Sequence, residues 1–222
     1  QFNAPATMRT LSLTAGVLNG SGNVTVTDSF SNTGGTFSIT GNASITQAAG
    51  NLTLTQPVSA GSLVLNALSG AILDGTGIPG ATMVLIDTRS YVKLVGFEIR
   101  NDLGVHDGSG VRVLGSGSHI EIRNNDIHDI RGTDAMGITV YATDPATPIS
   151  DLVIDGNTIH DCEPARSEAL TLNGNVTAFA VTNNVVRDVN NIGIDFIGGE
   201  TDIQPDPMKV ARSGVCSGNQ VI

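Results

Sequence analysis

The sequence predicts an all-β protein, and more closely a parallel β-helix of roughly eight or more stacked coils. Two kinds of observation support this prediction, the composition and two sets of internal repeats. The 222 residues include 27 glycines and no tryptophan, and only 14% of them are charged. Such a mixture suits short strands joined by Gly, Asn and Asp turns, and it supports long helices poorly.

The clearer repeats lie in residues 91–222. In five segments, apolar and polar residues alternate with period two and then reach a Gly or an Asn. The segments are residues 92–96, 120–124, 152–156, 179–183 and 214–218, with start-to-start spacings of 28, 32, 27 and 35 residues. Loops of changing length inserted into a constant coil explain the uneven spacing, because a solenoid tolerates insertions at its loops.

A second strand is expected within each coil. Its inward-facing pairs are Val111/Val113, Ile138/Val140, Leu170/Leu172 and Ile194/Phe196. Four asparagines follow the first strand at the same place in successive coils, namely Asn125, Asn157, Asn184 and Asn219. Because parallel strands pair about 4.8 Å apart, equivalent residues should form columns, and the asparagines should form a ladder of amide hydrogen bonds.

Simpler repeats occupy residues 11–70, where short alternating strands are separated by Gly, Asn and Ser turns. Residues 16–27 resemble the repeats of bacterial surface haemagglutinins and autotransporter passengers, which implies a β-solenoid there too. We expect residues 1–70 to form simple repeats and residues 71–222 to form a β-helix with loop insertions, within one continuous solenoid. Because the chain begins with Gln1 and residues 218–222 stop within a repeat, we expect a processed or excised part of a longer chain.

Residues 82–222 resemble the pectate-lyase-like superfamily of right-handed parallel β-helix proteins. The matching segments are residues 122–129, 154–161, 168–175 and 190–195, which read IRNNDIHD, IDGNTIHD, EALTLNGN and NNIGID. The resemblance implies the hand of the coil. It implies no single activity, because the superfamily hosts lyases, hydrolases, epimerases and non-catalytic adhesins.

The charge and the cysteines narrow the class of protein. A net charge of −10 argues against nucleic acid as a partner, because phosphate binding needs a basic surface. No apolar run is long enough to predict a membrane span. We expect a bacterial protein that is secreted or held at the cell surface, as a monomer or as part of a longer chain. Cys162 and Cys216 align two coils apart, too far for a disulfide, so we expect two free thiols with Cys216 buried.

One column of candidate site residues precedes the second strand and contains Asp107, Asp134, Arg166 and Asn190. Carboxylates one strand spacing apart raise a pKa or bind a cation, so Asp107 and Asp134 are candidate Ca²⁺ ligands. Arg166 is a candidate catalytic base, as an arginine or lysine is in many pectate-lyase relatives. The interpretation that we favour is a salt bridge between neighbouring turns.

A second column points outward from the second strand and contains Arg112, Thr139, Thr171 and Asp195, flanked by Tyr141, Asn173, Glu168 and Glu200. Hydroxyl, amide and carboxyl groups suit the hydroxyls of sugars, and paired carboxyl groups suit glycosidic cleavage. Asp195 and Glu168 are therefore candidate catalytic residues. The candidate substrate-binding residues are Thr139, Tyr141, Thr171, Asn173 and Glu200. The alternative is an ordinary solvated sheet face.

A third column contains Arg100, His128, His160 and Arg187. The two histidines are candidates for metal ligands or for an acid–base pair. However, the same Ile-His-Asp word recurs at the same turn of two coils, so we favour a structural role for it.

Two functional hypotheses share the recognition of an extracellular polysaccharide. In the first, the protein is a polysaccharide lyase or glycoside hydrolase that uses Asp195, Glu168 and Arg166, with or without calcium. In the second, it is a non-catalytic adhesin or stalk at the cell surface. The lyase residues of the superfamily do not transfer one by one, because the only lysines, Lys93 and Lys209, lie outside the carboxylate columns. The sequence leaves open whether the protein is an enzyme.

Overall fold

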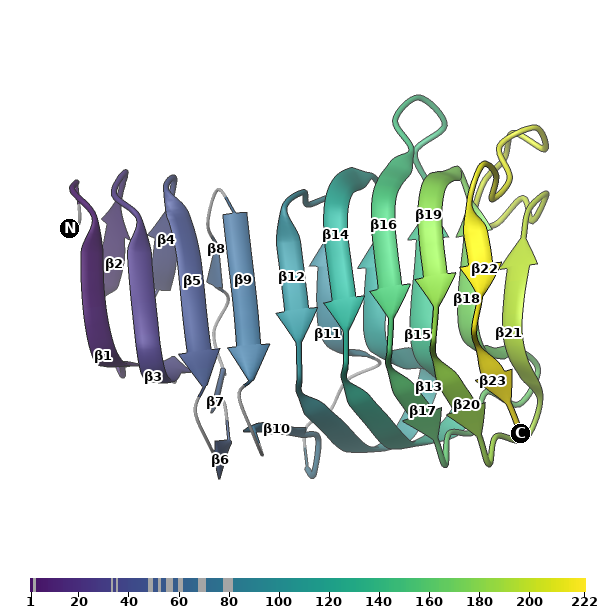
Figure 1. Cartoon of the computed structure of the whole chain (residues 1–222), viewed down its shortest axis with the longest axis horizontal. Helices are drawn as coiled ribbons and strands as arrows, with labels where there is room; N and C mark the ends of the chain where they lie inside the picture. Colours follow the sequence, from purple (N-terminus) through teal and green to yellow (C-terminus); the bar gives the residue numbers. More distant parts are fainter. Residues whose placement is uncertain are drawn as a thin grey trace. The chain divides into compact units, whose positions relative to one another are not determined.

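The structure of the protein is a computed structural model that describes residues 1, 3–32, 34, 36–47, 50, 51, 53, 54, 58, 59, 62–67, 71–77 and 82–222. These residues form 23 strands and no helix, which confirms the all-β prediction for the described part of the chain (Figure 1). Within that part, there is no helix with the length and apolar character needed to cross a membrane. The chain divides into two compact units, Gln1–Leu73 with Tyr91–Phe97 and Asp74–Ser90 with Glu98–Ile222.

The first unit contains parallel sheets built from the simpler repeats. In its larger sheet the strands pair in the order β1 (Ala6–Leu13), β3 (Val24–Asn32), β5 (Asn42–Gln47), β9 (Ser62–Ala67) and β12 (Val92–Val95). A smaller parallel sheet contains β2 (Val17–Gly20), β4 (Thr36–Ile39) and β8 (Val58–Ser59). The short strands β7 (Thr53–Leu54) and β6 (Gly50–Asn51) pair with β3 and with β10 (Ala71–Asp74).

The period-two pattern of the first unit places every second side chain in its core. Val24, Val26, Ile45, Phe30 and Phe37 are at most 2% exposed, and the two phenylalanine rings pack edge to face with centroids 5.6 Å apart. Parts of the predicted simple repeats of residues 11–70, and of the predicted boundary between residues 70 and 71, fall outside the described residues.

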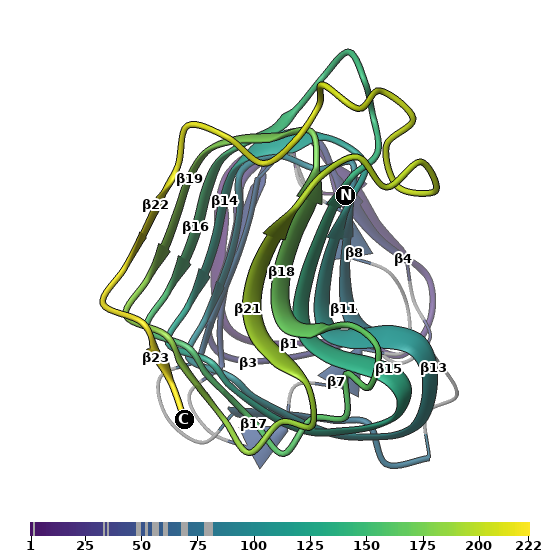
Figure 2. The ribbon, with the colours of Figure 1, turned by 90° about the vertical axis from the view of Figure 1, so that its right-hand side faces the viewer.

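The second unit consists of longer parallel sheets. One sheet pairs β14 (Gly117–Arg123), β16 (Ile149–Asp155), β19 (Val176–Thr182) and β22 (Val215–Ser217). The other contains β11 (Thr82–Asp87), β13 (Glu98–Leu114), β15 (Asp126–Ala142), β17 (Thr158–His160), β18 (Glu168–Gly174), β20 (Val185–Arg187), β21 (Ile192–Ile197) and β23 (Gln220–Val221). In the end-on view of Figure 2, β14, β16, β19 and β22 face β18 and β21 across the interior of this unit.

The registers of these sheets match the columns that the sequence predicts. Ile122 lies opposite Ile154, and Ile154 lies opposite Val181. On the facing sheet, Ile138 lies opposite Leu170, and Leu170 lies opposite Ile194. A one-residue slip would turn every apolar side chain of a strand toward solvent, so the buried pattern itself fixes the register.

The two predicted strands of a coil are present as β12 and β13 and again as β14 and β15, but β13 and β15 are longer than expected, because each runs for 17 residues. Both bend where an aspartate adopts a positive φ, 53° at Asp107 and 53° at Asp134. Aspartate tolerates this left-handed conformation better than most residues. Pairing therefore continues on both sides of the bend.

The predicted asparagine ladder is present. The side-chain oxygen of Asn157 accepts both the backbone N–H of Asn125, at 3.0 Å, and its amide N–H, at 2.9 Å. Asn184 does the same for Asn157, and Asn219 does so for Asn184. Asn157 also donates to the carbonyl of Ile122 at 2.9 Å. The ladder thus satisfies the buried polar groups of the turn and holds successive coils in register.

The prediction for the cysteines is half correct. Both thiols are free, but Cys162 is the buried one, at 2% exposure, and Cys216 is exposed. Cys216 lies opposite the buried Val181 of β19, but β22 is the outermost strand of its sheet among the described residues. Burial in this fold needs a strand on both sides, and Cys216 has a strand on one side only.

The ladder predicts the effect of removing one rung. Asn157→Ala leaves the buried N–H groups of Asn125 without an acceptor, at a cost of about 3 kcal/mol. The expected fall in the melting temperature is about 6–12 °C, measured by circular dichroism. Asn191→Ala, which removes an exposed asparagine that donates to the Ser167 carbonyl, is the matched control and should change stability by less than about 0.5 kcal/mol. Equal losses in the two variants would contradict the ladder's role.

The two thiols should differ in reactivity. Burial raises the pKa of the Cys162 thiol to about 12, so little thiolate forms at this residue in the folded protein. A thiol reagent at pH 8 should label Cys216 rapidly and Cys162 only after denaturation. Cys216→Ser should abolish the fast phase; a fast phase that survives this substitution would show that Cys162 is accessible.

Candidate functional site

The outward-facing side chains of β13, β15, β18 and β21 form the candidate site of the second unit. Strand register places Arg112 opposite Thr139, Thr139 opposite Thr171, and Thr171 opposite Asp195. One step further along, Tyr141 lies opposite Asn173. We call the following residues the polar face: Arg112, Thr139, Tyr141, Glu168, Thr171, Asn173, Asp195 and Glu200. Its alignment confirms the second column predicted from the sequence.

The polar face is more buried than an ordinary solvated sheet. Thr139 and Thr171 are fully buried, Asn173 is 2% exposed and Glu168 is 8% exposed. Part of the cover is the insertion after β21, at residues 198–212. There the side chain of Glu200 accepts a hydrogen bond from Asn173, and buried Gln204 donates to the carbonyl of Thr143. The insertion therefore packs over the ends of β15 and β18.

Arg112 organises the first half of the polar face. Its guanidinium donates to Thr139 Oγ1 at 3.1 Å and to Asp107 Oδ1 at 3.0 Å. The same group lies 5.0 Å from the centroid of the Tyr141 ring, in a cation–π contact. The hydroxyl of Ser109 completes the network, 2.7 Å from that of Thr139. Arg112 thus provides the positive partner of Asp107.

Tyr141 is only partly accessible. Burial raises the pKa of its phenol to about 12, and the hydroxyl lies 3.6 Å from the sulfur of Met136. Tyr141 therefore presents a neutral ring, packed between the guanidinium of Arg112 and the Met136 side chain.

Asp134 and Arg166 form the salt bridge that the sequence favoured for the first column. Arg166 donates to Asp134 Oδ2 from its guanidinium, at 2.7 Å, and to Oδ1 from its backbone N–H, at 3.3 Å. These bonds lower the pKa of Asp134 and raise that of Arg166, which keeps the guanidinium protonated. Asn190, the next member, accepts a hydrogen bond from the backbone of Ala165.

This pairing bears on the candidate Ca²⁺ ligands and on the candidate base. Asp107 and Asp134 each have an arginine partner, Arg112 and Arg166. A protonated guanidinium accepts no proton. Arg166 is therefore poorly suited to act as a catalytic base. The carboxylates of Asp107 and Asp134 each form an ion pair with a guanidinium.

Three carboxyl groups gather in the second half of the polar face. Glu168 lies in a part of the sheet that is poorly solvated, and this burial raises its pKa. The negative charges of Asp195 and Glu200 raise it further, while a hydrogen bond from Ser167, at 2.8 Å, opposes the shift. Asp195 accepts the backbone N–H of Phe196 at 2.7 Å. The set thus combines a carboxyl whose pKa is raised with a second carboxyl nearby.

Two buried polar atoms lie on β18 beside these carboxyl groups, since Thr171 is opposite Asp195 and Asn173 bonds to Glu200. Thr171 Oγ1 and Asn173 Oδ1 have no hydrogen-bond partner, although both side chains are at most 2% exposed. Buried polar atoms are satisfied in the great majority of cases, so each exception needs an explanation. Both exceptions fall on one strand, β18, and on the face predicted to bind a ligand. Their burial was not predictable from the sequence, because the covering insertion has no repeat pattern.

The histidine column forms a ladder of its own. The rings of His128 and His160 stack with centroids 4.7 Å apart and planes 9° apart. In each motif Nδ1 lies within hydrogen-bond distance of the following aspartate, at 2.9 Å for Asp129 and 2.7 Å for Asp161. This repetition supports a structural role for the motif. Asp126, two residues before His128 and on the same face, was not singled out by the sequence analysis, although its Asp-x-His spacing was a usable signal.

A shallow cleft of about 290 Å³ lies away from the polar face. Its lining includes Arg131, Cys162, Glu163 and Asn190. Arg131 lies in ion pairs with Glu163 and with Asp129. The cleft thus contains charged groups that already pair with one another, and the polar face remains the better candidate.

Comparison with known proteins assigns the chain to a family. Residues 68–220 match the family model described as a protein of unknown function, DUF1565. The chain belongs to the DUF1565 family. This DUF1565 chain is also similar to the uncharacterized protein YwoF of Bacillus subtilis (strain 168), at 43% identity over 123 residues. That alignment covers 53% of the chain and 26% of YwoF, so the chain spans about a quarter of the relative's length. No solved structure matches the chain.

The DUF1565 match includes the whole polar face and the histidine ladder. Every residue of both lies between residues 68 and 220. The two sites are therefore features of the family region.

The pKa shifts of Glu168 and Asp134 predict opposite pH dependences for two variants. The pKa of Glu168 is raised from 4.5 in the folded protein, so its ionisation reduces stability as the pH rises above that value. Glu168→Gln should therefore be more stable than the parent at pH 7, and the gain should vanish below about pH 4. The measurement is urea unfolding between pH 3 and pH 8.

Asp134→Asn is the variant of opposite sign. Its pKa is lowered from 3.8, so the ionised group stabilises the fold above that pH, and the contribution disappears as the pH falls through the lowered value. The variant should be less stable than the parent at pH 7 and equal to it at low pH. The same sign of change in both variants would overturn the electrostatic description of these two carboxyl groups.

Proposed function

We propose that this DUF1565 chain is a right-handed parallel β-helix, related to the pectate-lyase-like superfamily, that binds an extracellular polysaccharide across its polar face. The parallel registers of the second unit, the return of the chain to the same sheets every 27–35 residues and the asparagine ladder support the β-helix. Roughly eight or more coils agree with the repeats of both units. A secreted or cell-surface location is part of the proposal.

The observation that carries the proposal is the pair of unsatisfied buried atoms among carboxyl groups. Thr171 Oγ1 and Asn173 Oδ1 lie on β18, next to the strand that carries Asp195. A sugar hydroxyl both donates and accepts, so it can bond to a threonine hydroxyl, an amide oxygen and a carboxylate together. A ligand of this kind would reach the two atoms if the Glu200 side chain moved away from Asn173.

The rest of the polar face agrees with a glycan. Sites for small ligands combine an aromatic or apolar surface with a few convergent polar groups. Here Tyr141 supplies the neutral ring, and Thr139, Arg112 and Asp107 supply a bonded network at one end. A chain of sugars lying across β13, β15, β18 and β21 would meet a new strand about every 4.8 Å.

Cleavage of the bound glycan is the enzymatic form of the proposal. Glycoside hydrolases use one carboxylic acid with a raised pKa and a second carboxyl group. Glu168, whose pKa is raised by burial, would protonate the leaving oxygen as the glycosidic C–O bond breaks. Asp195 would take a proton from the attacking water. Hydrolysis fits the polar face better than β-elimination, because the protonated Arg166 is a poor base.

A non-catalytic adhesin or stalk is the second candidate. It is supported by the simple parallel repeats of the first unit, whose sequence resembles surface haemagglutinins and whose strands pair as a regular sheet. In this case the polar face would bind the glycan without cleaving it.

The test is a polysaccharide panel of neutral and uronic-acid polymers, with and without CaCl₂. Binding is measured by calorimetry, hydrolysis by new reducing ends, and elimination by the absorbance of unsaturated products. Asp195→Asn should weaken binding about tenfold. Glu168→Gln should lower any hydrolytic rate by about 10²–10⁴-fold.

Asp151→Asn is the matched control, because Asp151 is an exposed aspartate on β16 of the other sheet. It should leave binding and cleavage unchanged. Binding without cleavage would favour the adhesin, and the absence of binding over the whole panel would refute the proposed function. An equal effect of Asp151→Asn would show that the polar face is not the binding site.

A further inference from the structure

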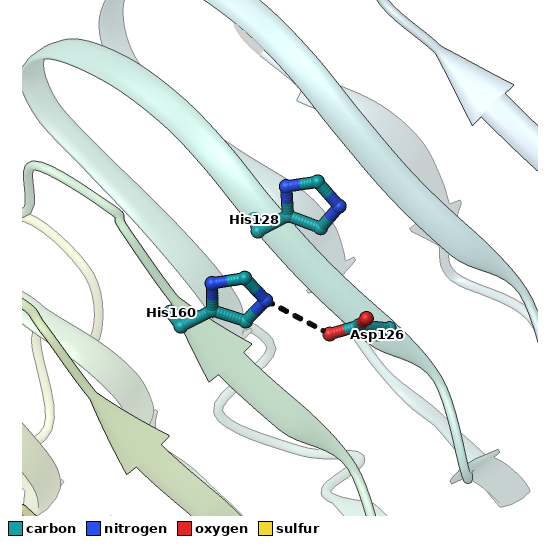
Figure 3. Close-up of side chains that lie close together, drawn as sticks. All are labelled: Asp126, His128 and His160. Atoms are coloured by element: carbon teal, nitrogen blue, oxygen red, sulfur yellow. Dashed lines mark hydrogen bonds and ion pairs between the residues drawn. The ribbon is translucent and has the colours of Figure 1, made fainter.

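Three side chains outside the polar face converge on one point of the second unit. Asp126 and His128 lie two residues apart on β15, and His160 lies opposite His128 on β17 (Figure 3). One ligand atom from each of the three lies within 4.8 Å of the other two. Among the described residues, this is the single group of three or more His, Cys, Asp and Glu side chains that meets this distance. The histidines are 16% and 13% exposed, and Asp126 is 54% exposed.

Each histidine lies between two carboxylates, and this arrangement has one donor too few. His160 faces Asp161 with Nδ1, at 2.7 Å, and Asp126 with Nε2, at 3.1 Å. His128 faces Asp129 with Nδ1, at 2.9 Å, and Glu98 with Nε2, at 3.4 Å. An ionised carboxylate only accepts, and a neutral imidazole has only one N–H. One nitrogen of each neutral ring would therefore turn a lone pair toward a negative oxygen.

In the neighbouring rungs of the column, arginine side chains supply hydrogen-bond donors to the carboxylates. Arg100 precedes His128 in the column, and its guanidinium donates to Asp74 at 3.0 Å and also to Glu98. Arg187 follows His160 and donates to Asp188 at 2.6 Å. A permanent cation thus occupies the column on either side of the two histidine rungs.

We propose that Asp126, His128 and His160 together bind one divalent transition-metal ion, for which Zn²⁺ is the probe. Two imidazole nitrogens and one carboxylate oxygen are a ligand set that Zn²⁺ accepts, with solvent at the fourth position. Asp129 and Asp161 would hold the Nδ1 protons, which leaves both Nε2 lone pairs for the metal. This carboxylate–histidine–metal arrangement is the usual support of histidine ligands.

Zn²⁺ binding would require the stacked rings of His128 and His160 to change their arrangement. Ligand atoms about 2.0–2.1 Å from one ion are closer together than 4.8 Å, so the two rings must tilt out of their parallel arrangement. Asp126 is more than half exposed and is free to turn toward the ion. Metal binding is therefore expected to break the stack while it preserves the Nδ1 bonds.

The experiment is a calorimetric titration of the metal-stripped chain with ZnCl₂ at pH 7.5. One equivalent should bind. Asp126→Asn and His160→Gln should each weaken binding by at least about tenfold, and Asp161→Asn, which removes only the support of the ring, by about 10–100-fold. Asp126→Asn keeps both rings, so it remains informative if the histidine variants unfold. Nitrogen-15 NMR of the histidine rings should show Zn²⁺ at Nε2 of both.

His119→Gln is the matched control, because His119 also lies near a carboxylate, 3.8 Å from Asp151, but does not belong to the group of Asp126, His128 and His160. It should leave Zn²⁺ binding unchanged. The proposal fails if binding is substoichiometric, if Asp126→Asn binds as tightly as the parent, or if both nitrogens of each ring remain protonated in excess Zn²⁺. The last result would identify a ladder of imidazolium ions instead. None of these outcomes depends on whether the polar face binds a glycan.

Discussion

The parallel backbone pairing between successive strands is the constraint on which the second unit depends. Each strand contributes its side chains in a register that the next strand repeats, and the ladder of Asn125, Asn157, Asn184 and Asn219 joins the coils at one turn. Every rung satisfies buried N–H groups that water cannot reach. Because Asn157 and Asn184 each accept in one rung and donate in the next, the register of one coil is tied to that of its neighbours. The columns of the candidate sites are a consequence of this pairing.

Stacking at one strand spacing also creates an electrostatic problem, because like residues in a column become close neighbours. The second unit meets it by placing cations among its carboxylates. Arg112 forms an ion pair with Asp107, Arg166 with Asp134, and Arg100 with Asp74. Two places depart from this rule. The carboxyl groups of Glu168, Asp195 and Glu200 lie beside unsatisfied atoms of β18, and each of the two stacked histidines faces two carboxylates. These departures are the two candidate sites.

The two sites differ in how the fold supports them. The polar face depends on an insertion, since Glu200 and Gln204 cover the ends of β15 and β18. Ligand access there would be coupled to the position of residues 198–212. The proposed metal site lies on β15 and β17, whose backbones are paired, and its rings are held by aspartates that follow them directly in the chain. Sites on paired strands are positioned more rigidly than sites beneath loops.

The sequence by itself determined the strand columns of the second unit. Period-two alternation and the recurring asparagines are local signals, and the hydrophobic pattern fixes the register. Thr139, Thr171 and Asp195 could therefore be aligned from the sequence alone. Only the tertiary structure decided what covers each column and which partner each charge takes. In the structure, Thr171 and Asn173 are buried, Cys162 is buried while Cys216 is exposed, and the two stacked histidines lie close to Asp126. The path of an insertion, the side-chain rotamers and the presence of a covering strand depend on contacts between residues far apart in the sequence, and no local pattern encodes them.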